Sequence, residues 1–271
     1  MVVPTRDRPE ALAGCLAALA LQHPPVDVVV VDDGSCDEAA VAAVAQAAPG
    51  TRLVRLEGRG PAAARNAGLA AAPGAVVCFT DDDCRPDPGW ALAITQAVAD
   101  GASVAAGPTV VGAADDHVAA AAQVVTNHLV EESLDAGRST VGFAPTSNLG
   151  GARAVFEALP FDERYPAAAG EDRDWCARLA SSGRLITWVP HAVVRHHPAL
   201  SLRGFWRQQE RYGRGARLVH SSGAGGRAGL GFYLRLLQRG GRTGWREGAL
   251  VALAQVATAA GYLRAGAPER R

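Results

Sequence analysis

Carboxylates cluster at two places where an apolar segment ends. Asp32 and Asp33 follow residues 27–31, which are mostly valine, and three aspartates at 81–83 follow residues 75–80. Short apolar runs are typical of buried parallel strands, and open α/β sheets bind ligands at the carboxyl ends of their strands. Three adjacent like charges repel one another unless a cation relieves them. A divalent ion held by carboxylates and substrate phosphates is the usual solution, so we expect a metal–phosphate site there.

Simpler interpretations of both clusters stay open on these residues alone. Asp and Gly dominate turns, so residues 32–35 (Asp-Asp-Gly-Ser) could be turn chemistry, and residues 81–83 could form a solvated loop. The absence of lysine favours the metal, because all 27 basic residues are arginine. Walker-type phosphate loops and Schiff-base enzymes both require lysine and are excluded. A metal ion is then the natural means of neutralising a leaving diphosphate.

Composition bounds the class of protein further. The 271 residues are 48% hydrophobic and carry no formal net charge, which fits a globular protein with a real core and gives no general case for nucleic acid. Five cysteines without a CxxC pair argue against a disulfide framework or a zinc site and favour a reducing cytoplasm. Charged residues at 6–10 interrupt any early apolar run, so we expect no signal peptide.

The elements that must position the carboxylates alternate along the first hundred residues. Strand-like segments alternate with helix-like segments at short intervals, and this pattern predicts right-handed βαβ units and a mainly parallel sheet flanked by helices. The expected strands are residues 1–4, 27–31, 51–56 and 75–80, and the expected helices are residues 9–21, 37–48 and 61–72. Asp37 is a plausible N-cap.

The pattern loosens after residue 100. We expect strands at 103–112, 141–151, 185–189 and 192–196, a mostly helical excursion at 114–137 and a helix at 171–182. A basic amphipathic helix at 201–219, a partly irregular stretch at 221–244 and an apolar helix at 248–263 complete the chain. A soft boundary near residue 200 separates the expected main domain, with a first part at 1–112 and a second at 113–200, from a helical extension at 201–271.

Ordered motifs give this α/β pattern a family likeness. PTRDR lies at residues 4–8, VVDDGS at 30–35, GPAAARNAG at 60–68 and TDDD at 80–83, and TSNLG, FDE, GED and VRH follow at 146–150, 161–163, 170–172 and 194–196. With these motifs in this order, the chain resembles the family 2 glycosyltransferases over residues 1 to about 217. The resemblance implies a GT-A fold, a nucleotide-sugar donor, a divalent cation (Mn²⁺ or Mg²⁺) and inverting transfer to an acceptor hydroxyl.

The resemblance implies roles on the nucleotide side. Pro4, Thr5 and Arg8 would border the base, and Asp32 would accept a hydrogen bond from it. Arg65, on the third expected helix, would help to hold the nucleotide or the sugar. The base itself is left open, so the donor could be a UDP-, GDP- or dTDP-sugar.

The resemblance also assigns the D-x-D element and a late histidine. Asp83 is the expected direct metal ligand. Asp81 is expected on the ribose or sugar side and is a second metal candidate, and Asp82 could share either task. His196 would complete the metal shell or contact the diphosphate, with His197 as the alternative, although a lone histidine is more often structural.

Inverting transfer needs a carboxylate that takes the proton of the attacking hydroxyl. By likeness to the family's Glu-Asp pair, Asp172 is the expected base and Glu171 its neighbour. Both begin an expected helix, where backbone N–H groups stabilise negative charge. Acids are common at helix starts for that reason alone, which is the competing interpretation.

The C-terminal extension has two interpretations. Arg207, Arg211, Arg214 and Arg217 recur at helical spacing, so they share one face, which is either a solvated surface or a contact for anionic phosphate. Residues 248–263 are shorter than the roughly 20 residues a spanning helix needs. We therefore expect a cytoplasmic protein with possible contact at the inner membrane surface, and a saccharide, a lipid-linked molecule or another alcohol as the acceptor.

Two rival functions stay open on the sequence. A sugar-phosphate nucleotidyltransferase also uses an α/β sheet and acidic metal ligands, but it needs a glycine-rich basic loop after the first strand, and residues 4–8 contain no glycine. A nucleotide-sugar-binding module without catalysis is the non-enzymatic rival, and the intact carboxylate sets argue against it.

Overall fold

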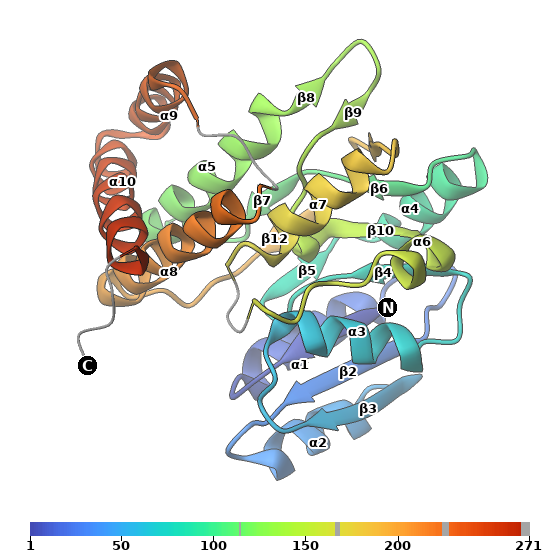
Figure 1. Cartoon of the computed structure of the whole chain (residues 1–271). Coiled ribbons are helices and arrows are strands. Elements are labelled where there is room, and N and C mark those ends of the chain that lie inside the picture. The colour runs from blue at the N-terminus through green and yellow to red at the C-terminus, as the bar shows by residue number, and fades with distance from the viewer. Residues whose placement is uncertain (114, 166–168, 224–227, 267–271) are drawn as a thin grey trace.

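The computed structural model describes residues 1–113, 115–165, 169–223 and 228–266. Its first half is a parallel sheet whose strands lie in the order β3 (Thr51–Leu56), β2 (Val28–Asp33), β1 (Val2–Thr5) and β4 (Val76–Phe79). The helices α1 (Pro9–Leu19), α2 (Glu38–Ala47) and α3 (Pro61–Ala71) connect these strands (Figure 1). This confirms the α/β alternation expected from the first hundred residues. The Asp37 side chain caps α2 by accepting a hydrogen bond from the Ala40 N–H.

The second half of the sheet is mixed. Strand β10 (Leu149–Ala152) lies antiparallel between β4 and β6 (Val104–Ala106). Strand β11 (Ile186–Trp188) then runs parallel to β6, and the short strands β9 (Thr140–Val141) and β8 (Leu134–Asp135) complete the nine-stranded sheet. Glycine at 150 and 151 allows the close packing of β10, because a Cβ at Gly151 would lie 2.5 Å from the carbonyl oxygen of Ser103.

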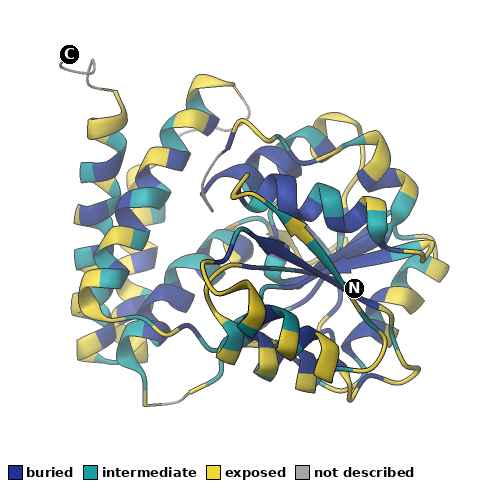
Figure 2. Ribbon diagram, turned by 90° about the horizontal axis from the view of Figure 1, so that it is seen from below, coloured by how far each residue is buried: buried dark blue, intermediate teal, exposed yellow. Residues whose placement is uncertain are grey.

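Alternate residues of the parallel strands face opposite sides of the sheet, as the strand period of two requires. On β2, Val29 and Val31 belong to one hydrophobic cluster, and Val28 and Val30 belong to another. The first cluster lies under α3, α6 (Arg153–Ala158) and α7 (Glu171–Ser181), and the second under α1, α2 and α4 (Trp90–Ala99). Figure 2 shows the buried strands inside, with the exposed faces of the helices outside.

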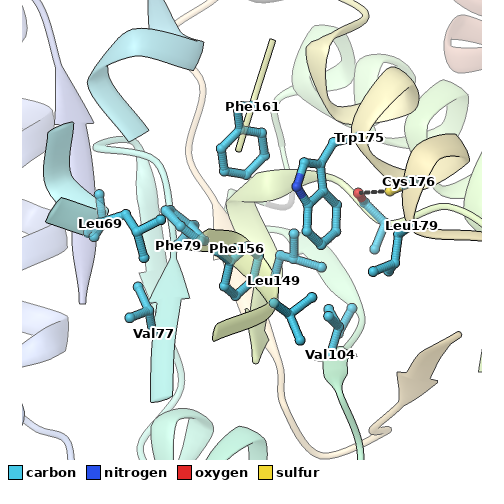
Figure 3. Close-up of a cluster of buried hydrophobic side chains, with 14 of the residues drawn as sticks. Leu69, Val77, Phe79, Val104, Leu149, Phe156, Phe161, Trp175, Cys176 and Leu179 are labelled. Atoms are coloured by element: carbon cyan, nitrogen blue, oxygen red, sulfur yellow. Dashed lines mark hydrogen bonds between the residues drawn. The ribbon is translucent and has the colours of Figure 1, made fainter. Parts of the chain in front are cut away.

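An aromatic group fixes α7 against the sheet. Phe79 of β4 meets Phe156 and Phe161 edge to face, and Trp175 of α7 stacks on both of these rings (Figure 3). The Trp175 indole N–H donates to the carbonyl oxygen of Leu159 at 2.6 Å. Trp175 is therefore a core residue and is fully buried. Its packing sets the position of the carboxylates at the start of α7.

A second sheet has three strands, which the sequence did not reveal as a separate unit. Strand β12 (Val194–His196) lies between β5 (Cys84–Pro86), to which it is antiparallel, and β7 (Thr109–Val111), to which it is parallel. In this register His196 is directly opposite Cys84. The late segment that ends at His196 is thereby brought beside the aspartates at the end of β4.

The C-terminal part is helical. The helices α8 (Leu202–Ser221), α9 (Leu230–Thr243) and α10 (Trp245–Ala265) gather with α5 (His117–Glu132) around a third hydrophobic cluster, on the side of the molecule away from β3 (Figure 1). Glycines let α8 and α10 cross with their backbones in contact, because a Cβ at Gly213 would collide with the Thr258 carbonyl and one at Gly261 with that of Glu210.

Two expectations for this part need correction. Residues 230–243 form a regular helix, although residues 221–244 were expected to be irregular in part. The apolar helix runs over 21 residues, Trp245–Ala265, and is longer than the expected 248–263. By length and composition alone α10 could cross a membrane, with a mean hydropathy of 1.2. The expectation that it is too short to span a bilayer was therefore wrong, because Trp245–Glu247 extend the helix at its start and Arg264 and Ala265 extend it at its end.

Candidate active site

Charged side chains from distant parts of the chain line one cavity of about 900 Å³. They come from the loop after β1, from α3, from the end of β4, from the start of α7 and from β12. The charged groups in this part of the lining are Arg8, Arg65, Asp81, Asp83, Glu171, Asp172, Arg173 and His196, and Arg211 of the C-terminal helix α8 also lines the cavity. The cavity therefore brings together the D-x-D aspartates and the Glu-Asp pair, which are separated by about ninety residues of sequence.

The three adjacent aspartates point in different directions. Asp82 is fully buried and accepts a hydrogen bond from the Thr5 hydroxyl at 2.7 Å. It also forms an ion pair with Arg8 at 2.5 Å. Burial raises the pKa of Asp82 to about 7, against the opposing charge of Arg8. Asp82 is not among the residues that line the cavity, whereas Asp81 and Asp83 are. The structure thus places Asp82 as a support that holds the β1 and β4 ends together.

Asp83 and His196 form the candidate metal centre. One carboxylate oxygen of Asp83 lies 3.4 Å from His196 Nε2, and the other accepts from Arg8 at 2.8 Å. His196 Nδ1 lies 3.0 Å from the side-chain oxygen of Gln123, which fixes the ring orientation. Burial opposes the charge on Asp83, but His196 and Arg8 outweigh it and hold the pKa of Asp83 below its usual value. The pKa of His196 is raised, because Asp83 outweighs the effect of burial.

The donor atoms of this centre fit a hard divalent cation. Potential ligand atoms of Asp83, Cys84 and His196 lie within 4.8 Å of one another. A carboxylate oxygen and a neutral imidazole suit Mn²⁺, with remaining positions left to phosphate oxygens and water. Burial raises the pKa of the Cys84 thiol well above its usual value, so this group stays protonated and is a poor ligand.

His197 does not share this position. Its backbone N–H donates to the Asp83 carbonyl at 2.8 Å, while its ring packs against Gly112, where a Cβ would collide with it. Only His196 of the two lines the cavity. Gln123, which orients His196, is a site residue that the sequence did not reveal, because a glutamine on a helix carries no distinguishing signal.

Arg65 joins the two carboxylate groups. Its side chain is 4% exposed, and its guanidinium donates to Asp81 at 3.0 Å and to Glu171 at 3.1 Å. Burial opposes the charge of Arg65, but Asp81 and Glu171 outweigh it and raise its pKa. A guanidinium can bind two carboxylates at once because its donors form a rigid fork. Arg65 therefore fixes the start of α7 relative to the end of β4.

The two acids at the start of α7 have different surroundings. Glu171 is buried and held by Arg65, while Asp172 accepts from the N–H of Arg173 at 2.7 Å and lines the cavity. Burial raises the pKa of both carboxyls. The charge of Asp172 raises the pKa of Glu171 further, and the charge of Asp81 adds to the rise for Asp172. A carboxylate with a raised pKa beside a cavity is suited to accept a proton.

The residues expected at the nucleotide base lie beside the cavity. Thr5 pairs with Asp32 in the register of β1 and β2, yet neither they nor Pro4 line the cavity. Asp32 accepts from the Ser35 N–H at 2.9 Å and is ion-paired with Arg55. Its neighbour Asp33 has a separate task. It accepts from the N–H groups of Arg59 at 2.7 Å and Gly60 at 2.8 Å, which fixes the start of α3.

Comparisons with known proteins agree with this arrangement. The sequence profile of glycosyl transferase family 2 matches residues 1–159. The chain is 30% identical over 223 residues to a pre-mycofactocin glycosyltransferase of Mycobacterium tuberculosis, a match that covers 79% of this chain and 45% of that protein. It is 29% identical over 224 residues to the glycosyltransferase AglE of Haloferax volcanii, covering 79% and 71%. The chain thus spans less than half the length of the mycobacterial relative.

Solved structures share the fold. The mannosyltransferase PcManGT of Pyrobaculum calidifontis, in complex with GDP-Man and Mn²⁺, superposes with a TM-score of 0.63 at 23% identity over 98% of this chain and 75% of that one. Glucosyl-3-phosphoglycerate synthase of Mycobacterium tuberculosis, in complex with Mn²⁺, UDP and glucosyl-3-phosphoglycerate, superposes with a TM-score of 0.58 at 19% identity. The superposition covers 81% of this chain and 77% of that one. With its family profile, its ordered motifs and this GT-A architecture, the chain belongs to glycosyl transferase family 2.

Proposed function

We propose that this chain transfers a sugar from a nucleotide-diphosphate sugar to an acceptor hydroxyl with inversion at the anomeric carbon. The observation that carries the proposal is the convergence of Asp83 and His196 with Asp172 in one cavity. Residues 1–112 hold the donor together with His196, the rest of residues 113–200 meets the acceptor, and residues 201–271 complete the acceptor side. Both solved relatives above were crystallised with Mn²⁺ and a nucleotide, GDP-Man in one and UDP in the other, which supports a donor of this class.

The donor is held by groups of both signs. Asp83 and His196 would hold a Mn²⁺ or Mg²⁺ ion, with Asp81 beside them on the sugar side, and the ion would act as Lewis acid for the leaving diphosphate. Arg8 lies next to Asp83 and adds a positive charge at the same place. Pro4, Thr5 and Asp32 would border the base of a UDP-, GDP- or dTDP-sugar. Asp82 would not contact the donor itself but would hold Thr5 in position through their hydrogen bond.

Transfer is then a single displacement. The acceptor oxygen forms a bond to the anomeric carbon as the bond from that carbon to the diphosphate oxygen breaks, which inverts the configuration. Asp172 takes the proton of the attacking hydroxyl, and the nucleoside diphosphate leaves with the bonding electron pair. Glu171 and Arg65 hold Asp172 in position at the start of α7. Most of the acceleration comes from positioning and electrostatics.

Contact with a membrane surface also belongs to the proposal. The helices α8–α10 carry ten arginines and two glutamates. Large apolar side chains are exposed beside these arginines, including Leu230, Leu234 and Trp245. Helices of this composition lie at the interface of anionic membranes. Sedimentation with vesicles that contain anionic lipid tests this contact, and equal recovery with neutral vesicles at low salt would contradict it.

One assay separates the transferase from its rivals. The purified chain is incubated with UDP-, GDP- and dTDP-sugars and Mn²⁺ or Mg²⁺, and the products are identified. Release of nucleoside diphosphate that depends on the metal supports the transferase. Pyrophosphate released from a nucleoside triphosphate and a sugar phosphate would indicate a nucleotidyltransferase, and donor binding without turnover would indicate a binding module.

A further inference from the structure

The cavity has two chemically different ends. One end is lined by the carboxylates, Arg8 and His196 described above. The other end extends between the helices α5, α9 and α10. Most side chains that line it are apolar or aromatic, including Val125, Leu129, Phe232, Leu236, Ala259 and Leu263, and the polar side chains there are Thr126, Gln255 and Thr258. Nothing in the proposed donor chemistry uses this apolar end. A nucleotide-sugar is polar throughout, so the apolar end is suited to a different molecule.

The apolar end reaches the surface of the protein. Tyr233 and Leu263 both line the cavity and are 42% and 71% exposed. They belong to α9 and α10, which lie side by side at the edge of the molecule (Figure 1). A long apolar group can therefore enter between these helices while its polar end reaches Asp172.

A buried amide of α8 also lines the cavity. Gln209 of α8 is fully buried, and neither its side-chain nitrogen nor its oxygen has a hydrogen-bond partner among the described residues. A buried amide without partners is costly to a protein, and Gln209 lines the same cavity as Asp172. A hydroxyl or other polar group of a bound molecule would supply the missing partner.

We propose that the α5–α9–α10 end of the cavity is the acceptor subsite and that it takes an amphiphilic acceptor, with its reacting hydroxyl at Asp172 and an apolar body between the helices. This assignment rests on the proposed transferase function and narrows its acceptor class. A free saccharide would leave its hydroxyl groups without partners against Leu236 and Phe232, so it fits this end poorly. Gln209 contacts the polar part of the acceptor next to the reacting hydroxyl.

Chain length of a probe tests the subsite directly. The full chain, with Mn²⁺ and UDP, is titrated calorimetrically with n-alkyl β-glucosides from methyl to octyl, each below its micelle concentration. Because the apolar end buries the alkyl chain, the dissociation constant should fall by about four-fold with each added methylene. Equal affinity for methyl and octyl glucoside overturns the proposal.

A matched pair of substitutions locates the effect. Ala259→Trp places an indole in the apolar end and should remove the dependence on chain length. Ala252→Trp is the control, because Ala252 is also an exposed alanine of α10 but does not line the cavity. Retained dependence in Ala259→Trp, or its loss in both variants, would contradict the assigned position.

Gln209→Leu tests the polar contact, because a residue that only stabilises the fold would not weaken ligand binding while thermal stability is kept. Leucine removes two unsatisfied buried groups, so the thermal stability should be unchanged or higher. Octyl glucoside should nevertheless bind about ten-fold more weakly, as the loss of one hydrogen bond to a ligand predicts. A fall in stability with unchanged binding would remove Gln209 from the acceptor contact.

The same experiments keep the two proposals distinguishable. Binding of UDP, GDP and dTDP with Mn²⁺ is measured in every variant. If none of them binds to the unsubstituted chain, the transferase proposal fails whatever the glucosides do. If one binds and the chain length has no effect, the acceptor assignment alone fails. Octyl glucoside offered in solution and within vesicles then identifies whether the amphiphile comes from water or from a bilayer, and saturable binding from either source supports the subsite.

Discussion

Arg65 and Glu171 form a buried ion pair, with guanidinium nitrogen and carboxylate oxygen 3.1 Å apart, across 106 residues of sequence. The same guanidinium also binds Asp81. The pair therefore connects the metal side of the cavity to the helix that carries the expected base. Several predictions depend on this connection.

Loss of Arg65 should leave two carboxylates without their cation. Arg65→Met should lower the free energy of unfolding by about 3–5 kcal/mol, because Glu171 then stays buried without a partner. Urea unfolding measures this. Adding Glu171→Gln to Arg65→Met should recover part of the loss, because it removes the buried charge. If the two substitutions are additive, the ion pair is not the cause.

Asp172→Asn should abolish transfer and leave donor binding largely intact. The base acts on the acceptor proton, and its loss should cost about 10²–10⁴-fold in kcat. Turnover and Mn²⁺-dependent nucleotide binding are measured together. Asp100→Asn, on an exposed residue at the end of α4, is the matched control and should have no effect on either. Loss of nucleotide binding in Asp172→Asn would contradict the assigned role.

Asp83→Ala should weaken the metal-dependent binding of nucleoside diphosphate. The variant removes a ligand atom that no neighbouring group replaces, so titration with Mn²⁺ should require a higher concentration for half-saturation, by about 10-fold or more. Asp87→Ala serves as the control, since Asp87 is paired with Arg195 and does not line the cavity. An unchanged Mn²⁺ titration in Asp83→Ala would exclude Asp83 from the metal centre.

The activity should fall on the acid side at a higher pH than for a solvated carboxyl. Burial raises the pKa of Glu171 and Asp172 in the folded protein. The base works only when ionised, so activity is present above the folded pKa of the pair and is lost as the pH falls through it. The profile of kcat/KM against pH reports this as an apparent value of the coupled pair. An acid limb centred near about pH 4, the usual range for Asp and Glu, would contradict it.

Gly213→Ala should destabilise the protein. The added methyl group meets the Thr258 carbonyl where α8 and α10 cross, and forced separation of packed elements costs about 1–3 kcal/mol. Gly241→Ala on α9 is the control, because a Cβ there meets nothing within 4 Å. It should instead stabilise the helix slightly, since alanine has the higher helix propensity. Thermal unfolding of both variants makes the comparison, and equal shifts would mean that the crossing is not tight.

The parallel half of the sheet was predictable from the sequence because β1, β2 and β4 are short valine-rich runs and a helix follows each of β1, β2 and β3. The three adjacent aspartates at 81–83 also predicted a metal–phosphate site. Their separate directions did not follow from the sequence, because Asp82 turns inward only where Thr5 and Arg8 meet it. The small sheet of β5, β7 and β12 depends on pairing between segments about a hundred residues apart, and strands of three residues give too little periodicity to reveal it.

The C-terminal helices were harder to predict from the sequence than the strands of the small sheet. Glycines at 231, 240 and 241 suggested an irregular segment, since glycine is a poor helix former. Tertiary contacts overrule that preference, because Gly240 packs closely against Val251 of α10. Gln123 and Gln209 carry no motif, and their positions beside His196 and in the cavity wall become visible only once α5 and α8 are placed.

In the proposed enzyme, the middle strand of the small sheet, β12, carries the expected metal ligand His196. The family profile ends at residue 159, before both Asp172 and His196. A chain shortened to the shared region would keep its aspartates at the end of β4 but would lack the strand between β5 and β7 that supplies the histidine. A fragment that ends with the family profile would therefore lack both the expected base and the expected histidine.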